Sequence, residues 1–282
     1  MRRRFLRNLL GMAGLVLVGA GCAVWPCGGP VDEARTPAFT FVQMCDTQLG
    51  MGGYGHDLLT FQEAVKKINA LDPDFVAICG DLVHVPDAIS FADFNDIRKR
   101  FRVPCHCVPG NHDVSNSPTT NTLAYYRAVI GEDYYAFTHK GCRFVVSNAE
   151  LWKTWVPGES EQHDAWFRET LKAAHAQGQP VYVFGHHPPF ADRWDEPEDG
   201  RNLPVERRME LFKLYRDYGV VAVLSGHLHN TSVHEHDGVL YVCGETTSRN
   251  FDGGPIGYRV WQVAGTNVIS HTPVEVKLPN AD

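Results

Sequence analysis

The chain has 282 residues, of which 44% are hydrophobic, 21% charged and 11% aromatic. This composition is typical of a soluble globular protein with a sizeable core, and it excludes a disordered, collagen-like or polytopic membrane protein. The formal net charge is −7. The first 22 residues contain four arginines and no acidic residue, so the remainder carries 22 basic against 33 acidic residues, a net charge of −11. We therefore do not expect a nucleic-acid-binding surface.

Residues 1–27 have the layout of an export signal. Four arginines precede an apolar stretch from Leu9 to about Val18, and three small residues follow at 19–21. The run Arg2–Arg7 resembles a bacterial twin-arginine signal. The alternatives are a retained membrane anchor and lipidation of Cys22, and either would be the only expected contact with a membrane. We therefore expect an exported protein that is periplasmic or associated with the cell envelope of a bacterium.

Seven further cysteines follow Cys22. Most of them lie in short apolar runs, where cysteine is commonly buried without a bridge. The triplet Cys105-His106-Cys107 suggests a zinc site, but it lacks the second cysteine pair of a zinc motif. Alternate residues share one face of a strand, so we interpret the triplet as part of a strand.

After a Pro- and Gly-rich linker at 28–37, predicted strands and helices alternate. The strands are short apolar runs, typical of parallel strands buried on both faces, and the helices repeat apolar residues every three or four positions. In chain order we expect strand 39–45, helix 58–71, strand 75–79, helix 88–101, strand 103–108, helix 119–130, strand 144–147, helix 161–176, strand 181–184, helix 205–218, strand 220–225, and strands 239–244, 257–263 and 267–272. This order predicts an α/β fold in which helices lie outside two packed sheets.

Acidic, amide and imidazole side chains follow five of these strands directly. They are Asp46 and Gln48 after the first strand, Asp81 after the second, Asn111, His112 and Asp113 after the third, His186 after 181–184, and His227 and His229 after 220–225. Open α/β sheets bind ligands at the carboxyl ends of their strands, so we expect these loops to converge. The irregular stretch 186–204 is long for a loop, and we interpret it as a lid over this site.

The converging side chains offer oxygen and imidazole ligands and require no thiolate. This donor set suits Mn, Fe, Zn or Co. It exceeds what one ion needs, whereas two divalent ions that share one carboxylate would use it fully. Two-metal sites are a known device for cleaving phosphate esters. Two divalent ions beside two aspartates would also make the site locally positive, which attracts phosphate to an otherwise acidic protein.

Together the five motifs resemble those of the calcineurin-like metallophosphoesterases. They are Asp46-x-Gln48, Gly80-Asp81, Gly110-Asn111-His112-Asp113, Gly185-His186 and Gly226-His227-x-His229, in the family's order within residues 39–272. The resemblance implies a four-layer α/β/β/α sandwich, with a single domain at 38–275 and a C-terminal tail at 276–282. It also implies a metal-dependent phosphoesterase. Gln48 in place of the usual histidine resembles one branch of the family, which includes a protein phosphatase.

The family pattern implies a role for each motif residue. The first ion would be held by Asp46, Gln48 and His229, the second by Asn111, His186 and His227, and Asp81 would bridge both. A metal-bridging hydroxide would attack phosphorus in line. His112 would be the general acid for the leaving oxygen, oriented by Asp113. The neutral amide of Gln48 is a weaker ligand than imidazole and would alter the metal preference of the first ion.

The substrate class stays open between a phosphomonoester, including a phosphoprotein, and a phosphodiester such as a cyclic nucleotide. Candidates for contact with the substrate are Asn111, Arg249, Asn250 and His56. We interpret His187 as a positioning residue rather than a ligand. A non-catalytic metal-binding scaffold is a further alternative, but such a protein would be expected to have lost ligands or His112.

Overall fold

The computed structural model describes residues 38–265 and 267–278. The predicted export segment 1–27 and linker 28–37 lie outside the described residues, as do residues 279–282 of the predicted tail. The described residues form helices α1–α7 and strands β1–β11. No helix in these two ranges is both long and apolar enough to cross a membrane.

The first sheet has five strands in the order β11-β10-β1-β2-β3. Their bounds are β1 Phe39–Met44, β2 Phe75–Cys79, β3 Cys105–Val108, β10 Gly257–Ala264 and β11 Asn267–Glu275. The first three strands are parallel, and β10 and β11 extend the sheet in antiparallel fashion on the other side of β1. The carboxyl ends of β1, β2 and β3 therefore lie at one edge of the sheet, as the predicted site requires.

The second sheet has six strands in the order β4-β5-β6-β7-β9-β8. Their bounds are β4 Tyr135–His139, β5 Cys142–Val146, β6 Val181–Phe184, β7 Val220–Ser225, β8 Ser232–His236 and β9 Val239–Cys243. The inner strands β5, β6, β7 and β9 are parallel, and the two edge strands are antiparallel to their neighbours. The sequence prediction missed β4 and β8, because edge strands carry polar, half-exposed residues instead of a continuous apolar run.

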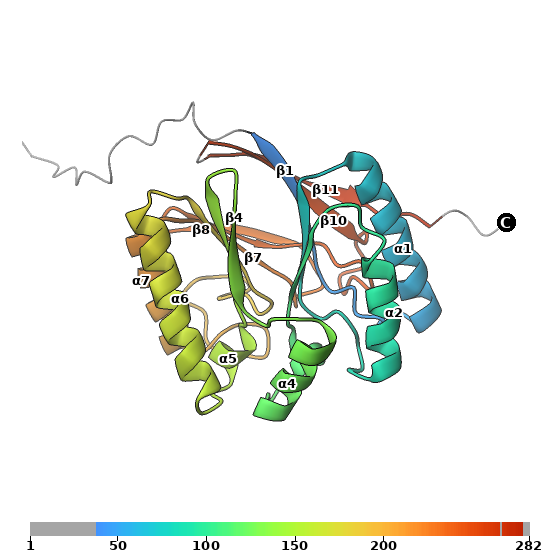
Figure 1. The fold of residues 1–282 in the computed structure, drawn as a ribbon, viewed down its shortest axis with the longest axis horizontal. Coiled ribbons are helices and arrows are strands. Elements are labelled where there is room, and N and C mark those ends of the chain that lie inside the picture. The colour runs from blue at the N-terminus through green and yellow to red at the C-terminus, as the bar shows by residue number, and fades with distance from the viewer. Residues whose placement is uncertain (1–37, 266, 279–282) are drawn as a thin grey trace, which may run out of the picture. The chain divides into compact units, whose positions relative to one another are not determined.

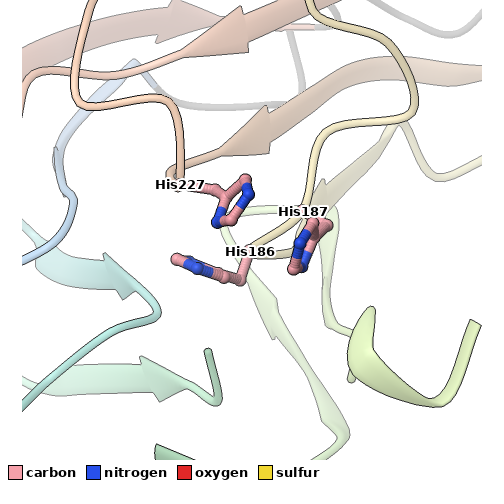
Figure 2. Close-up of side chains that lie close together, drawn as sticks. All are labelled: His186, His187 and His227. Atoms are coloured by element: carbon pink, nitrogen blue, oxygen red, sulfur yellow. The ribbon is translucent and has the colours of Figure 1, made fainter. Parts of the chain in front are cut away.

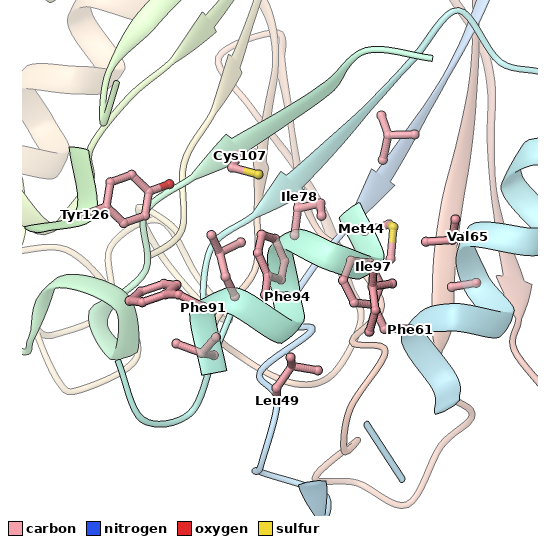
Figure 3. Close-up of a cluster of buried hydrophobic side chains, with 14 of the residues drawn as sticks. Met44, Leu49, Phe61, Val65, Ile78, Phe91, Phe94, Ile97, Cys107 and Tyr126 are labelled. Atoms are coloured by element: carbon pink, nitrogen blue, oxygen red, sulfur yellow. The ribbon is translucent and has the colours of Figure 1, made fainter. Parts of the chain in front are cut away.

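Helices cover the outer face of each sheet, which confirms the four-layer α/β/β/α arrangement (Figure 1). The long helices are α1 Tyr54–Leu71, α2 Ala88–Arg98, α4 Thr120–Val129, α6 Glu159–Ala176 and α7 Val205–Tyr218, with short helices α3 Asn111–Val114 and α5 Glu150–Lys153 between them. Helix α1 buries Phe61, Ala64, Val65 and Ile68, the spacing of one helical face. With Phe91 and Phe94 of α2, these side chains cover the first sheet (Figure 3).

Aromatic side chains fill the layer between the two sheets. Phe41 of β1 is fully buried and stacks between Phe75 and Trp261, with ring centroids 5.0 and 5.5 Å away. Phe144 and Tyr182 reach the same cluster from the second sheet. These offset and edge contacts fix how the two sheets pack, and so fix the positions of the loops that leave them.

The cysteines of the described residues are free thiols. Cys107 faces α2, where Arg98 contacts its sulfur at 3.2 Å, whereas His106 faces the other sheet and stacks on Phe137 at 3.8 Å between centroids. The triplet at 105–107 therefore alternates across β3, as the strand interpretation expects.

Burial makes His163 of α6 a source of acid sensitivity. It lies fully buried, and burial together with the nearby Arg207 cation lowers its pKa to about 3. Between that value and the usual pKa of about 6.5, the unfolded chain binds a proton that the folded protein does not, so stability falls as the pH is lowered from 7. In His163→Gln, whose amide can still accept from the Asn148 N–H, this loss should shrink by about 2 kcal/mol at pH 5.

Urea unfolding at pH 7 and pH 5 measures this difference. His175→Gln, an exposed substitution on the same helix, is the matched control and should titrate like the wild type. An equal loss of stability in wild type and His163→Gln would contradict the prediction.

Candidate metal centre

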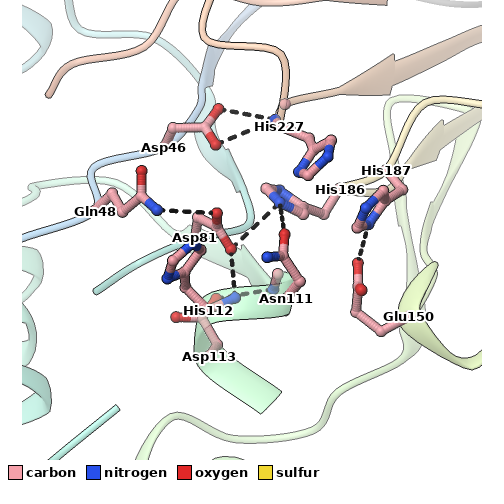
Figure 4. Close-up of polar contacts among 12 residues, drawn as sticks. Asp46, Gln48, Asp81, Asn111, His112, Asp113, Glu150, His186, His187 and His227 are labelled. Carbon is pink, nitrogen blue, oxygen red and sulfur yellow. Dashed lines mark hydrogen bonds and ion pairs between the residues drawn. The ribbon is translucent and has the colours of Figure 1, made fainter. Parts of the chain in front are cut away.

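The loops after β1, β2, β3, β6 and β7 converge at the carboxyl ends of both sheets. The structure brings together Asp46, Gln48, Asp81, Asn111, His112, His186 and His227 (Figure 4), and His229 lies beside Asp46 and Asp81; all of them are buried or half-buried. The side chains of Asp46 and His229 lie 3.4 Å apart, and those of Asp81 and His186 lie 3.3 Å apart. The predicted convergence is confirmed. It places two carboxylates, two amides and four imidazoles at one site.

The backbone adopts an unusual conformation at several of these positions. The φ angles are 49° at Asp46, 31° at Gln48, 50° at Asp81, 72° at His227 and 52° at His229. Positive φ is uncommon for residues other than glycine and costs free energy, and such residues cluster at functional sites. The surrounding loops hold this geometry, since the Asp46 N–H donates to the Gly80 carbonyl and the His227 N–H donates to the Asp46 carboxylate.

Two glycines allow these loops to approach each other. A Cβ atom at Gly80 would lie 2.4 Å from the His186 ring, and one at Gly110 would lie 2.2 Å from the Asp81 carboxylate. Any other residue would push these loops apart. The glycines that precede Asp81 and Asn111 in the motifs are therefore a packing requirement of the site.

The first donor set contains Asp46, Asp81 and His229, whose ligand atoms all lie within 4.8 Å of one another. Burial raises the pKa of Asp46 more than the neighbouring His229 and His186 imidazoles lower it. Gln48 lies beside this set, and its Oε1 is buried without a hydrogen-bond partner. Buried carboxylates need a cation, and an orphaned amide oxygen fits a metal ligand. These residues therefore fit a divalent ion.

The second donor set consists of His186, His187 and His227, whose ligand atoms also lie within 4.8 Å of one another (Figure 2). Asn111 joins it, since its Oδ1 lies 3.0 Å from His186 Nε2. Burial would lower the pKa of His186, but the Asp81 carboxylate outweighs it and raises that pKa well above its usual value. Imidazole and amide oxygen donors beside an anionic carboxylate also fit a divalent transition metal.

Backbone carbonyls fix the tautomers of His186, His227 and His229. They accept from His186 Nδ1 (Cys79, 2.9 Å), from His227 Nε2 (Gly200, 2.9 Å) and from His229 Nδ1 (Arg249, 2.6 Å). Because a carbonyl can only accept, each of these ring nitrogens carries a proton, and the opposite ring nitrogen is the one left to face an ion. Hydrogen bonds of this kind orient metal-ligating histidines.

Sequence analysis missed a buried pair beside the second set. The Glu150 carboxylate lies 2.6 Å from His187 Nδ1, and both residues are almost fully buried. The His187 ring packs on that of His227, with 3.8 Å between centroids. Glu150 follows β5 just as the motif residues follow their strands, so the rule that located the other residues could also have found it.

The prediction that Asp113 orients the ring of His112 is wrong. The Asp113 carboxylate accepts from the backbone N–H groups of Leu82, Val83 and Gly110, and so ties the loops after β2 and β3 together. The ring of His112 is held instead by the carbonyl of His84, 2.9 Å from its Nδ1. The correction has a geometric cause: Asp113 lies in the first turn of α3, where its carboxylate caps the N-terminus of its own helix.

The predicted substrate contacts lie at the margin of the site. Arg249 is exposed, and its backbone carbonyl accepts a hydrogen bond from His229 Nδ1. The side chain of Asn250 is occupied within its own loop by Asp252 and Pro255. His56 is exposed and contacts Asp57 at 3.0 Å. Asn111 is buried at the centre of the site.

Known proteins resemble this chain in sequence and in fold. Residues 39–231 match the sequence profile of the calcineurin-like phosphoesterase family. The chain belongs to this family. It is 31% identical to the serine/threonine-protein phosphatase CPPED1 of Danio rerio over 256 residues, which cover 82% of this chain and 83% of that protein. The CPPED1 of Mus musculus is 32% identical over 219 residues, which cover 69% of this chain and 70% of that protein.

Solved structures show the same architecture. A dimetal phosphatase from Danio rerio superposes with a TM-score of 0.64 at 13% identity, over 86% of this chain and all of that chain. The purple acid phosphatase PPD1 of yellow lupin superposes with a TM-score of 0.59 at 15% identity, over 86% of this chain and 54% of that chain. Family membership and the fitting donor sets make this chain a metal-dependent phosphoric ester hydrolase.

Metal binding should stabilise the fold through Asp81. At a Mn²⁺ concentration of about 100 times Kd, one bound ion adds about 2.7 kcal/mol to the unfolding free energy. For a protein of this size that raises Tm by about 5–10 °C. In Asp81→Asn most of this increase should be lost, whereas Asp252→Asn, an exposed substitution on a loop, should keep it. Differential scanning calorimetry with and without Mn²⁺ measures this rise in Tm. A rise in Asp81→Asn equal to that of the wild type would exclude Asp81 from the metal centre.

Gln48→His should strengthen metal binding. An imidazole is a stronger ligand for transition metals than a neutral amide oxygen, so we expect the apparent Kd of the tighter ion to fall about tenfold, or about 1.4 kcal/mol. Isothermal titration calorimetry of metal-free protein with Zn²⁺ or Mn²⁺ measures this Kd. Gln162→His on the exposed side of α6 controls for adventitious binding. Unchanged or weaker binding in Gln48→His would show that Gln48 is not a ligand.

Proposed function

We propose that this chain is a two-metal phosphomonoesterase that removes phosphate from phosphoserine or phosphothreonine in proteins. The observation that carries the two-metal part is the position of Asp81 between the donor sets. Its Oδ2 faces the Gln48 amide at 3.3 Å, and its Oδ1 lies 3.3 Å from His186 Nε2. One oxygen directed to each set is the arrangement that a bridging carboxylate needs. The similarity to the serine/threonine-protein phosphatases named CPPED1 supports the substrate.

The residues divide between the two ions as follows. Asp46, Gln48 and His229 would hold the first, Asn111, His186 and His227 would hold the second, and Asp81 would contact both. Mn, Fe, Zn and Co all suit these donors. Bound there, the ions would supply an activated water and would neutralise charge on the phosphoryl oxygens. The protein's task is to hold each donor in place, which the positive-φ backbone and the tautomer-fixing carbonyls accomplish.

His112 is the proton donor to the leaving oxygen. Its Nδ1–H donates to the His84 carbonyl, and its ring packs against that of His84, with 4.8 Å between centroids. This leaves Nε2 as the nitrogen that carries the transferable proton. The backbone N–H of His112 donates to Asp81 Oδ1 at 2.9 Å, and this bond fixes the position of the general acid relative to the bridging carboxylate. A serine alkoxide is a poor leaving group, and general acid catalysis is worth about 10²–10⁴ in rate.

We also propose that the protein acts outside the cytoplasm. The arginine-rich start and apolar stretch within residues 1–27 support export. The substrate is then a phosphorylated protein of the cell envelope. Fractionation of cells that express the full chain tests this location, and substitution of Arg2 and Arg3 by lysine should retain the protein in the cytoplasm if the twin-arginine route is used.

A cavity beside the second donor set supports phosphodiesterase activity as a second candidate. It measures about 480 Å³ and is bounded by Arg201, His227, His234 and Phe251. A diester requires room for a second substituent on phosphorus, which this volume provides. A peptide that flanks a phosphoserine would fill the same space. Turnover of p-nitrophenyl phosphate compared with bis-p-nitrophenyl phosphate, on metal-loaded enzyme, distinguishes mono- from diesterase activity.

The His112→Asn variant tests the proposed chemistry. On a phosphoserine peptide its kcat should fall by about 10²–10⁴, because the serine oxygen must be protonated as it leaves. On p-nitrophenyl phosphate, whose leaving group is stable as an anion, the loss should be much smaller. Asp81→Asn should lose activity on both substrates, and His175→Gln on the exposed end of α6 should lose none. Equal losses on both substrates in His112→Asn would show that His112 is not the general acid.

A further inference from the structure

Residues 190–203, the part of the predicted lid 186–204 that is called the lid below, contact the second donor set through Gly200 and are held by their own polar contacts. The centre of these contacts is the Glu196 carboxylate. It accepts from the backbone N–H groups of Ala191, Asp192 and Arg193 at 2.7–2.9 Å and from the Asn202 side-chain amide at 2.6 Å. Charge-assisted bonds of this kind are strong, so the lid has a defined structure without being a helix or strand.

Two cationic side chains outside the lid hydrogen-bond to its backbone carbonyls. Arg208 of α7 is fully buried and donates to the carbonyls of Trp194, Glu196 and Leu203. Lys153 of α5 donates to the carbonyls of Asp199 at 2.6 Å and Asn202 at 2.7 Å. Lys153 thus holds the peptide unit that joins Asp199 to Gly200.

The Gly200 carbonyl is the point at which the lid meets the donor set. It accepts from His227 Nε2 at 2.9 Å. The main chain of His227 is fixed separately, by the bond from its N–H to the Asp46 carboxylate. Among residues 38–265 and 267–278, however, Gly200 provides the only hydrogen bond that determines which nitrogen of the ring carries the proton. Without that acceptor both tautomers become accessible, and one of them places the proton on Nδ1, the nitrogen that would face the ion.

We propose that the lid positions His227 for the second ion, and that Lys153 acts as a positioning residue through Gly200. The inference rests on the proposed two-metal function. It makes the affinity for the second ion depend on a loop that is not itself a ligand. Removal of a hydrogen-bond partner of a metal-ligating histidine typically weakens metal binding by about 10–100-fold. The first ion, whose donors Asp46, Gln48 and His229 do not touch the lid, should be unaffected.

Three variants of the full chain separate positioning from general stability. Lys153→Met removes all three lid contacts, the two carbonyl bonds and the ion pair with Glu198, while keeping an unbranched side chain of similar length. Lys153→Arg retains two donors and should rescue the loss. Lys172→Met removes an exposed cation whose partner is Glu169 on the same helix, and is the matched control. The first measurement is the ¹⁵N NMR signature of His227 in metal-free protein, assigned with His227→Asn, which reports the tautomer directly.

The second measurement is a titration of each metal-free variant with Mn²⁺, counting ions bound. We expect wild type, Lys153→Arg and Lys172→Met to hold a single His227 tautomer and to bind two ions. In Lys153→Met we expect mixed tautomers, a second Kd raised about 10–100-fold and a first Kd within about twofold of wild type. Unchanged tautomer and second Kd in Lys153→Met would overturn the role of the lid. One ion bound by the wild type would instead overturn the two-metal proposal, so the two failures are distinguishable.

Discussion

The burial of two carboxylates at the junction of the two sheets is the constraint on which the site depends. Asp46 is fully buried and Asp81 is 2% exposed. A buried charge that lacks a partner is strongly unfavourable, and the only nearby cations among the described residues are imidazoles that protonation can supply. Divalent ions remove this cost. The fold therefore requires cations at the position where its family carries out phosphoester hydrolysis.

The rest of the architecture serves to hold this charge in place. Stacked aromatic rings fix the spacing between the sheets, and the carboxyl ends of parallel strands from both sheets then meet. Gly80 and Gly110 let the loops approach to distances that a Cβ would forbid. Positive φ angles at the ligand positions show that the loops are held away from relaxed backbone geometry. The free energy for that strain comes from the packed sheets beneath.

Hydrogen bonds from outside the donor sets orient the ligands. Carbonyls of Cys79, Gly200 and Arg249 each fix one ring nitrogen of a motif histidine. These acceptors come from a strand, from the lid and from the loop before β10, so the site draws its geometry from widely separated parts of the chain. Outer contacts of this kind commonly tune metal affinity as strongly as a change of ligand does. Of these three acceptors, only the Gly200 carbonyl belongs to the lid.

The sequence by itself determined the alternation of strands and helices, the loops that carry the candidate ligands, and the family. Apolar runs and helical periodicity are local properties, and the motif residues follow their strands directly, so no tertiary information was needed. Edge strands β4 and β8 were not predicted, because their residues are partly exposed and do not form a continuous apolar run. Asp113 was assigned to the wrong partner, since its capping of α3 depends on backbone geometry. The tertiary structure alone decided which atoms meet: Asp46 and His227 are 181 residues apart, and the contacts of Glu150 with His187 and of Gly200 with His227 also join separate loops. No local pattern encodes such pairs, because they form only when two packed sheets bring their loops to a common edge.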